Sequence, residues 1–150
     1  ALSIIEQSLQ RDWDSALVHV YGLCRASDTT RQIERAEAWL TEHADDPALL
    51  LALGRLCARA QLWGKAQSYI EASLSLEESF SARIELARLL QGLGETDAAR
   101  AHYEASLRLA EMELEPRGRA LLSQAPALAT SRSPTASALT RPMPVTPRPS

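Results

Sequence analysis

The sequence predicts an all-α protein: a right-handed α-solenoid of about three and a half helix pairs, followed by a disordered C-terminal tail. Composition is the first observation behind this class. Ala and Leu, two strong helix formers, supply 25 and 24 of the 150 residues, whereas Gly and Pro together supply 14. The second observation is an internal repeat with an offset of 33 residues, which carries Tyr69–Leu74 onto His102–Leu107. These features exclude an all-β fold.

Each repeating unit is predicted to be a pair of helices. Gly54 or Ala87 is the small residue of the first helix, and Ala66 or Ala99 is the small residue of the second, where two backbones approach closely. The pattern indicates seven helices. They are expected at 1–11, 15–26, 29–43, 47–60, 63–76, 79–92 and 96–112.

The first of these helices, 1–11, resembles the second helix of a unit. Ala1, Ile5 and Ser8 repeat its small and bulky positions. We expect Leu2, Ile5 and Leu9 to pack on the 15–26 helix and to leave an apolar end exposed, which favours self-association.

Boundary residues support the next elements in order. Thr29 and Gln32 have the spacing of a capping box for the 29–43 helix, and Asp46-Pro47 supplies an N-cap for the 47–60 helix. Gly92 and Gly94 are expected to end the 79–92 helix. Short connections imply that neighbouring helices run antiparallel.

Two unlike domains are expected, at 1–115 and 116–150. The first carries 11 basic and 19 acidic side chains, a net charge of −8. The second contains seven of the eight prolines, five arginines and no acid. This Pro/Ser/Thr/Arg-rich composition predicts a disordered tail.

Several classes of protein and site are excluded by missing patterns. No apolar run approaches the roughly 20 residues of a membrane span. Cys24 and Cys57 lie 33 residues apart without a CxxC motif, and His19, His43 and His102 lack partners at metal-binding spacing, so no metal site is expected. No catalytic motif occurs, so we expect no enzyme, and nucleic-acid binding is disfavoured by the acidic domain.

The predicted binding site is the inner face of the solenoid, which the first helix of each pair lines. Three arginines gather there on a small and apolar floor, and Arg suits bidentate contact with carboxylates. Their alternative role is pairing with acids of adjacent helices such as Glu85. The expected groove residues are His19, Leu51, Arg55, Arg59, Ile84, Arg88 and Gln91. The three tryptophans, Trp13, Trp39 and Trp63, are interpreted as packing residues.

Two resemblances follow from these residues. Gly54, Ala66 and Ser73 occupy the small positions typical of tetratricopeptide repeats when Pro47 is counted as first. In addition, four segments together resemble the C-terminal region of HemY-type haem-biosynthesis-associated proteins of proteobacteria. They are Val20–Leu23, Asp45–Pro47, Leu51–Cys57 and Gln61–Ala66. The resemblance implies a longer parent protein, anchored in the bacterial inner membrane by N-terminal helices absent from this chain, with the repeat domain in the cytoplasm.

Two functions are therefore considered. The leading hypothesis is a non-catalytic protein-interaction scaffold, with terminal haem-biosynthesis enzymes as partners and no cofactor. The alternative is a haem- or porphyrin-binding chaperone, in which His19 or Tyr21 is the axial ligand. On either hypothesis, Arg55→Ala and Arg88→Ala are expected to weaken binding at least tenfold and to change stability little, provided that both guanidinium groups are exposed.

Overall fold

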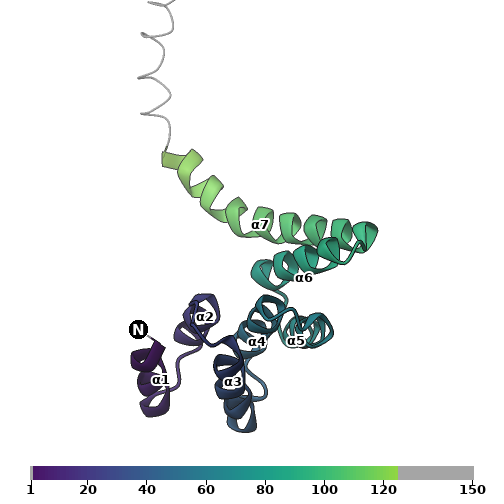
Figure 1. Ribbon diagram of the computed structural model, residues 1–150. Coiled ribbons are helices and arrows are strands. Elements are labelled where there is room, and N and C mark those ends of the chain that lie inside the picture. Colours follow the sequence, from purple (N-terminus) through teal and green to yellow (C-terminus); the bar gives the residue numbers. More distant parts are fainter. Residues whose placement is uncertain (1, 125–150) are drawn as a thin grey trace, which may run out of the picture. The chain divides into compact units, whose positions relative to one another are not determined.

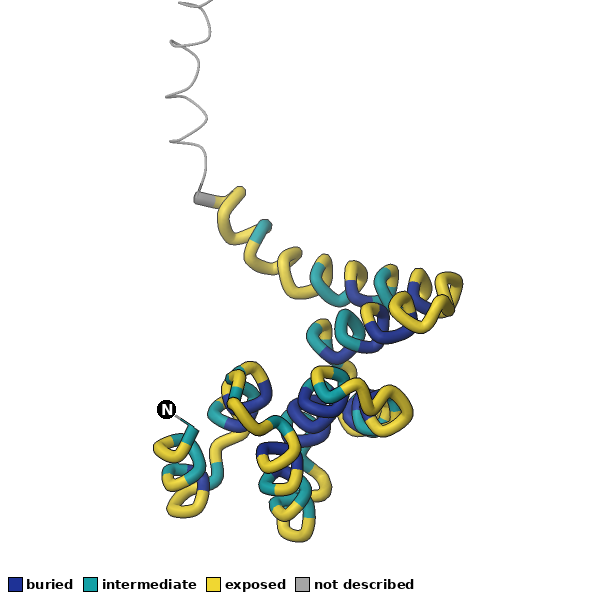
Figure 2. The backbone as a smooth tube through the Cα atoms, viewed as in Figure 1, coloured by how far each residue is buried: buried dark blue, intermediate teal, exposed yellow. Residues whose placement is uncertain are grey.

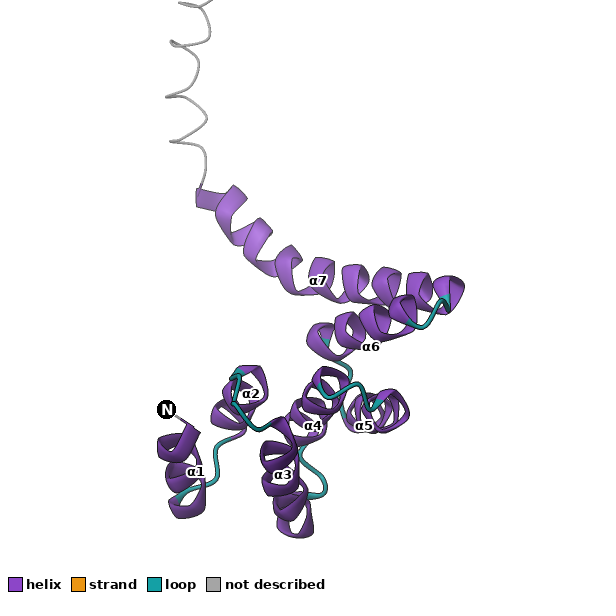
Figure 3. Ribbon diagram, in the orientation of Figure 1, coloured by secondary structure: helices purple, strands orange, loops and turns teal. Residues whose placement is uncertain are grey.

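The computed structural model describes residues 2–124, and every regular element among them is an α-helix. Short loops join the helices (Figure 3). The helices are α1 (Leu2–Arg11), α2 (Ser15–Leu23), α3 (Thr29–His43), α4 (Pro47–Arg59), α5 (Trp63–Leu76), α6 (Phe80–Gly92) and α7 (Thr96–Gln124). The predicted all-α class is confirmed. The bounds of the first six helices differ from the expected ones by at most three residues.

Acidic or hydroxyl side chains cap the N-termini of α2, α3, α4 and α6, whereas α5 has no side-chain cap. Asp14 caps α2, Asp46 caps α4 and Ser79 caps α6, each by accepting a hydrogen bond from a backbone N–H of the first turn. The predicted cap at Asp46-Pro47 is therefore confirmed. Gly94 has a φ of 84° and turns the chain after α6. The sequence predicted a helix end at this glycine.

The predicted capping box at Thr29 and Gln32 is wrong. Asp28 caps α3 instead, because its side chain accepts a hydrogen bond from the backbone N–H of Arg31. Gln32 is buried, and its Nε2 donates to the carbonyl oxygens of Tyr21 and Cys24 at the end of α2. Its amide therefore satisfies the C-terminus of the preceding helix instead of the N-terminus of its own.

The last helix runs further than the sequence indicated. We expected no regular structure from residue 116, but α7 continues to Gln124 and includes Pro116. Good helix formers follow this proline, and Glu115 and Arg119 form an ion pair one turn apart. The chain divides into two units, Ala1–Ala110 and Glu111–Ser150. Residues 125–150, on which the rest of the predicted tail falls, lie outside the described part.

The core of the first unit is built around α4. This helix contacts α2, α3, α5 and α6, and most of its residues are buried, as the dark blue tube in Figure 2 shows. The first helices of successive pairs thus lie in a row, α2 beside α4 and α4 beside α6 (Figure 1). None of the helices described here is both long and apolar enough to cross a bilayer.

Helix α1 packs on α2, as expected. Leu9 is buried, and Leu2 and Ile5 are partly buried against the core. Ile4 points outward with 70% of its surface exposed. Self-association through this apolar end stays a prediction.

Gly22→Ala is expected to destabilise the protein by about 1–2 kcal/mol, because overpacking a tight helix contact outweighs the gain in helix propensity. A Cβ at Gly22 would lie 2.8 Å from the Cα and the Cβ of Ala52, so α2 and α4 would have to move apart. Urea unfolding measures the loss. Gly64→Ala is the control, because no atom lies within 4 Å of its Cβ, and we expect a small gain in stability there. Equal stability of the two variants would contradict close packing of α2 on α4.

Candidate functional site

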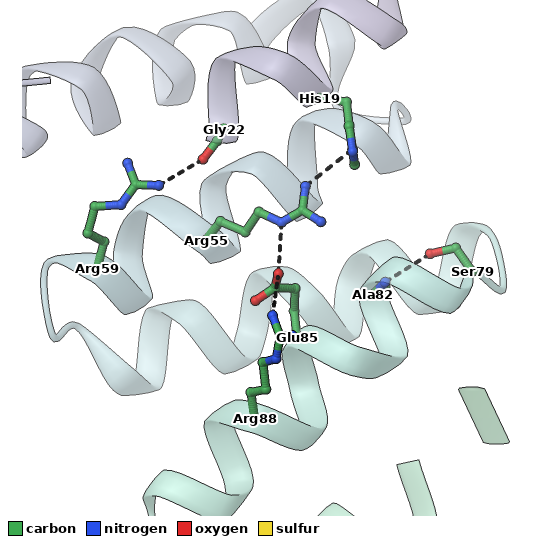
Figure 4. A network of polar contacts seen from close by, with 8 residues as sticks. All are labelled: His19, Gly22, Arg55, Arg59, Ser79, Ala82, Glu85 and Arg88. Carbon is green, nitrogen blue, oxygen red and sulfur yellow. Dashed lines mark hydrogen bonds and ion pairs between the residues drawn. The ribbon is translucent and has the colours of Figure 1, made fainter. Parts of the chain in front are cut away.

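The predicted groove residues lie on the row of helices α2, α4 and α6. Figure 4 shows the polar network that crosses this row, from His19 on α2 through Arg55 on α4 to Glu85 on α6. The prediction that His19, Arg55 and Arg88 share one face is therefore consistent with the structure. Their environments differ, however, and this difference decides which of them can meet a ligand.

Arg55 is a structural residue of this face. Its Nε donates to Glu85 Oε1 at 3.1 Å, and its Nη1 donates to His19 Nδ1 at 3.2 Å. The Arg55 side chain is only 9% exposed, and Glu85 is 23% exposed. Arg55 thus links three helices through one guanidinium group. Of the two roles considered for Arg55, the structure shows the pairing with Glu85 of an adjacent helix, so this guanidinium is not free to contact a ligand.

His19 is held neutral by its surroundings. Burial lowers its pKa below the ordinary value of 6.5, and the positive charge of Arg55 lowers it further, while Glu85 opposes the shift. Because Arg55 can only donate, His19 Nδ1 must be the acceptor, which leaves the ring proton on Nε2. Iron coordination by Nε2 would require moving this proton and breaking the bond from Arg55. The site therefore does not favour His19 as an axial ligand.

Tyr21 belongs to the core. Its side chain is 0% exposed, and its hydroxyl lies 3.1 Å from Glu6 Oε1 and 3.4 Å from the carbonyl oxygen of Gln32. Burial raises its pKa well above the ordinary value, and the Glu6 carboxylate adds to the shift. The expectation that Tyr21 could ligate haem iron is wrong, because its oxygen faces neighbouring helices and not a cavity.

Arg59 closes the C-terminus of α2. Its Nη1 donates to the carbonyl of Cys24 at 2.9 Å, and its Nη2 donates to the carbonyl of Gly22 at 3.2 Å. A cation at this position also suits the negative end of the helix dipole. Burial lowers the pKa of Arg59, and the like charge of Arg25 lowers it further. Arg25 and Arg59 are both exposed, so positive charge gathers at this end of the face.

Arg88 is far more exposed than Arg55. Its side chain is 67% exposed, and its one ion pair in the described residues is to Glu85, at 3.9 Å and one turn away. Such a loose surface pair contributes between 0 and about 1 kcal/mol. Because Glu85 is already committed to Arg55, most of the charge of Arg88 remains available to a ligand. We call Arg25, Arg55, Arg59 and Arg88 the arginine cluster.

The predicted apolar floor is only partly present. Leu51 is 4% exposed and belongs to the core, because α4 is covered by its neighbours on nearly every side. Leu51 and His19 do border a hollow of about 240 Å³ at the N-terminal ends of the three helices. Ile84 is partly buried, and Gln91 is exposed, with its Oε1 accepting a hydrogen bond from the Tyr103 hydroxyl.

Trp63 was missed as a surface residue. Trp13 and Trp39 pack against the core as expected, but Trp63 is 44% exposed at the first position of α5. It lines a hollow of about 260 Å³ together with Arg88, Leu89, Gly92 and Leu93. The available signals in the sequence were Lys65, two residues after Trp63, and the glycines at the end of α6, Gly92 and Gly94.

The described residues offer no cluster of three or more His, Cys, Asp or Glu side chains that could hold a metal ion. Cys57 is buried, and burial raises the pKa of its thiol. Cys24 is partly buried at the C-cap of α2. A buried thiol with a raised pKa is a poor nucleophile, so Cys57 is a packing residue.

Stability is expected to fall as the pH is lowered from 7.5 to 5.5. The pKa values of His19 and His102 are both lowered, by burial first and then by Arg55 and Arg83, respectively. Below about pH 6.5 the unfolded chain therefore takes up more protons than the folded one, which favours unfolding until the folded pKa values are also passed.

Urea titrations at the two pH values measure this loss. The lowered pKa values of Glu37 and Glu78 act only below their ordinary value of 4.5, so they do not interfere. The double variant His19→Gln and His102→Gln should show a clearly smaller pH dependence. An unchanged slope in this variant would contradict neutral histidines in the folded protein.

With this geometry established, the described part of the chain is defined as an all-α protein that exposes arginines on α4 and α6. Comparisons of this sequence with protein-family models, with curated proteins and with solved structures found no match.

Proposed function

We propose that this chain is a non-catalytic scaffold that binds an acidic segment of a partner protein on the face of α2, α4 and α6. The observation that carries the proposal is the set of exposed cations on this face. Arg59 on α4 and Arg88 on α6 are exposed, and the exposed Arg25, which follows α2, lies close enough to Arg59 to lower its pKa. Residues 1–115 nevertheless have a net charge of −8. Basic charge that gathers against the overall trend favours an anionic partner at that place.

The finer architecture belongs to the same proposal. We infer a right-handed solenoid of tetratricopeptide-like helix pairs, because the 33-residue repeat coincides with the helix pairs and the first helices of these pairs lie in a row. Helix rows of this kind suit extended partner segments.

The members of the arginine cluster have different proposed roles, some in stabilising the fold and some in binding. Arg55 holds the helices together and brings Glu85 to the centre of the cluster. Arg59 keeps its position through two carbonyl oxygens, while its exposed side chain adds positive charge. Arg88 is left to contact a carboxylate directly. The proposed binding residues are therefore Arg88 first and Arg59 and Arg25 second.

The identity of the partner rests on the sequence resemblance alone. If the HemY-type resemblance holds, the partners are terminal haem-biosynthesis enzymes at a bacterial inner membrane. The chaperone alternative is disfavoured, because the Tyr21 hydroxyl is engaged within the fold and the bond from Arg55 to His19 Nδ1 keeps the ring proton on Nε2, the atom that would bind iron.

Arg88→Glu is expected to weaken binding of an acidic peptide at least tenfold and to leave stability unchanged within about 0.5 kcal/mol. The probe is fluorescein-Glu-Glu-Ala-Glu-Glu-amide, here called the Ala peptide, and fluorescence anisotropy at low salt measures its affinity. Reversing the charge both removes an attraction and adds a repulsion. Added salt should weaken the binding to the unchanged protein, since exposed charges are screened.

Arg100→Glu is the matched control. It makes the same change in net charge at an exposed arginine of α7, a helix outside the row of α2, α4 and α6. The proposal predicts that this variant binds the Ala peptide nearly as well as the unchanged protein. Equal loss in the two variants would mean that only net charge matters, and no binding to the unchanged protein would contradict the proposed function.

A further inference from the structure

The hollow beside Arg88 has features that the proposed function does not use. Its volume is about 260 Å³, and it lies where the first residue of α5 meets the last turns of α6. Trp63 and Leu93 are 44% and 42% exposed at its rim. Leu89, which is nearly buried, contributes to its wall.

Large apolar side chains with more than two-fifths of their surface exposed line this hollow. Trp is highly buried in most proteins, and an exposed indole beside other apolar side chains is typical of contact sites. Leu62, the neighbour of Trp63, is also 44% exposed. Ordering these side chains against a second apolar group would remove their surface from water.

A glycine keeps the hollow open. Gly92 lines it, and a Cβ placed at Gly92 would meet no atom within 4 Å. Its φ is not positive, so the backbone does not require glycine here. The missing side chain therefore provides space and not conformational freedom, and a larger side chain at this position would project into open space without disturbing the packing.

The charge at the hollow defines the kind of ligand. Arg88 is the charged residue among those that line it, and its side chain is 67% exposed. A ligand with an apolar group next to a carboxylate can pack its apolar group on the indole of Trp63 and pair its carboxylate with the guanidinium of Arg88. A cationic apolar group would bring like charges together, and a purely acidic one would leave the apolar rim uncovered.

We propose that this hollow takes a bulky apolar side chain of the partner segment, next to an acidic residue that contacts Arg88. The inference rests on the proposed function and specifies its partner: an acidic segment with one large apolar residue in place of a uniformly acidic one. Trp63, Leu93 and Gly92 then determine specificity, while Arg88 supplies attraction.

The test compares two peptides that differ at one residue. The Phe peptide, fluorescein-Glu-Glu-Phe-Glu-Glu-amide, is measured beside the Ala peptide by anisotropy at low salt. We expect the Phe peptide to bind at least tenfold more tightly, because an aromatic side chain is removed from water. We also expect Trp63→Ala to reduce this preference to less than threefold.

Gly92→Met gives an independent check, because it fills the hollow with a side chain of this protein. The Phe peptide should then bind about as weakly as the Ala peptide, whose own affinity should not change. Gly118→Met, at another glycine with open space around its Cβ, is the matched control and should keep the preference. Far-ultraviolet circular dichroism establishes that all variants are folded.

The outcomes distinguish this inference from the proposed function. If both peptides bind equally and Arg88→Glu abolishes both, the face binds acidic segments but the hollow is not a side-chain site, and the inference is overturned. If neither peptide binds, the proposed function fails as well. A preference for Phe that persists in Gly92→Met also overturns the inference, because the apolar contact then lies elsewhere.

Discussion

Arg55→Ala is expected to lower the free energy of unfolding by about 3 kcal/mol, the low end of the range for breaking a buried ion pair. Truncation leaves Glu85 without its closest cation and His19 without the donor to its Nδ1. The low end is appropriate because Glu85 is 23% exposed and has Arg88 nearby. The small effect on stability that the sequence alone predicts for Arg55→Ala applies only to an exposed guanidinium, and Arg55 is buried in an ion pair.

Urea unfolding of Arg55→Ala and Arg88→Ala measures the contrast between the two arginines. We expect Arg88→Ala to stay within about 0.5 kcal/mol of the unchanged protein, because its side chain is mostly exposed. The variant Arg55→Met separates packing from charge, since it keeps the aliphatic stem and should still lose much of the stability. A loss below about 1 kcal/mol in Arg55→Ala would mean that water replaces its bonds, contrary to a structural role.

Tyr21→Ala is expected to cost about 4 kcal/mol, as for other large aromatic side chains removed from a core. Tyr21 is fully buried, and its ring meets that of Trp39 edge to face with centroids 5.0 Å apart. Its hydroxyl connects α2 to Glu6 on α1 and to the backbone of α3. One side chain thus links three helices, and the cavity left behind has little freedom to collapse.

Tyr21→Phe is the control for this prediction. It keeps the ring and removes only the hydroxyl, so we expect a loss of about 1 kcal/mol, the size of one or two net hydrogen bonds. Chemical unfolding followed by circular dichroism gives both values. If Tyr21→Ala proved as stable as Tyr21→Phe, the ring would not be a core element, and its assignment to packing would be wrong.

The helices were predictable because their signals are local. Asp46-Pro47 fixes the start of α4, and Gly94 fixes the turn after α6, each through the conformation of one or two residues. The end of α7 was not predictable in the same way. Pro116 usually ends a helix, but the good helix formers that follow it and the Glu115–Arg119 pair carry the helix to Gln124.

The site was only partly predictable, because its chemistry depends on neighbours from other helices. Arg55 and Arg88 occupy equivalent places in the 33-residue pattern, so sequence reasoning treated them alike. In the structure, Arg55 lies between α2 and α6 and finds a partner on each. Arg88 lies on α6, the last helix of the row α2, α4 and α6, so its ion-pair partner Glu85 is on its own helix. The position along the row, and not the residue type, decides which arginine stays exposed.

Trp63 shows the same limit. The pattern places it where a large residue usually packs between two helices, and two of the three tryptophans do pack in this way. Whether an indole at a helix N-terminus is covered depends on the size of the residues facing it. Here Gly92 offers no side chain, so the indole borders a hollow.

The central claim is that the face of α2, α4 and α6 binds an acidic partner segment, and backbone amide NMR of the ¹⁵N-labelled protein tests it most directly. The Ala peptide is titrated into the assigned protein at low salt. The account predicts that the largest shift changes fall on the exposed part of the arginine cluster, at Arg25, Arg59 and Arg88. Changes confined to α3, α7 or the outer side of α5, or no changes at all, would contradict it.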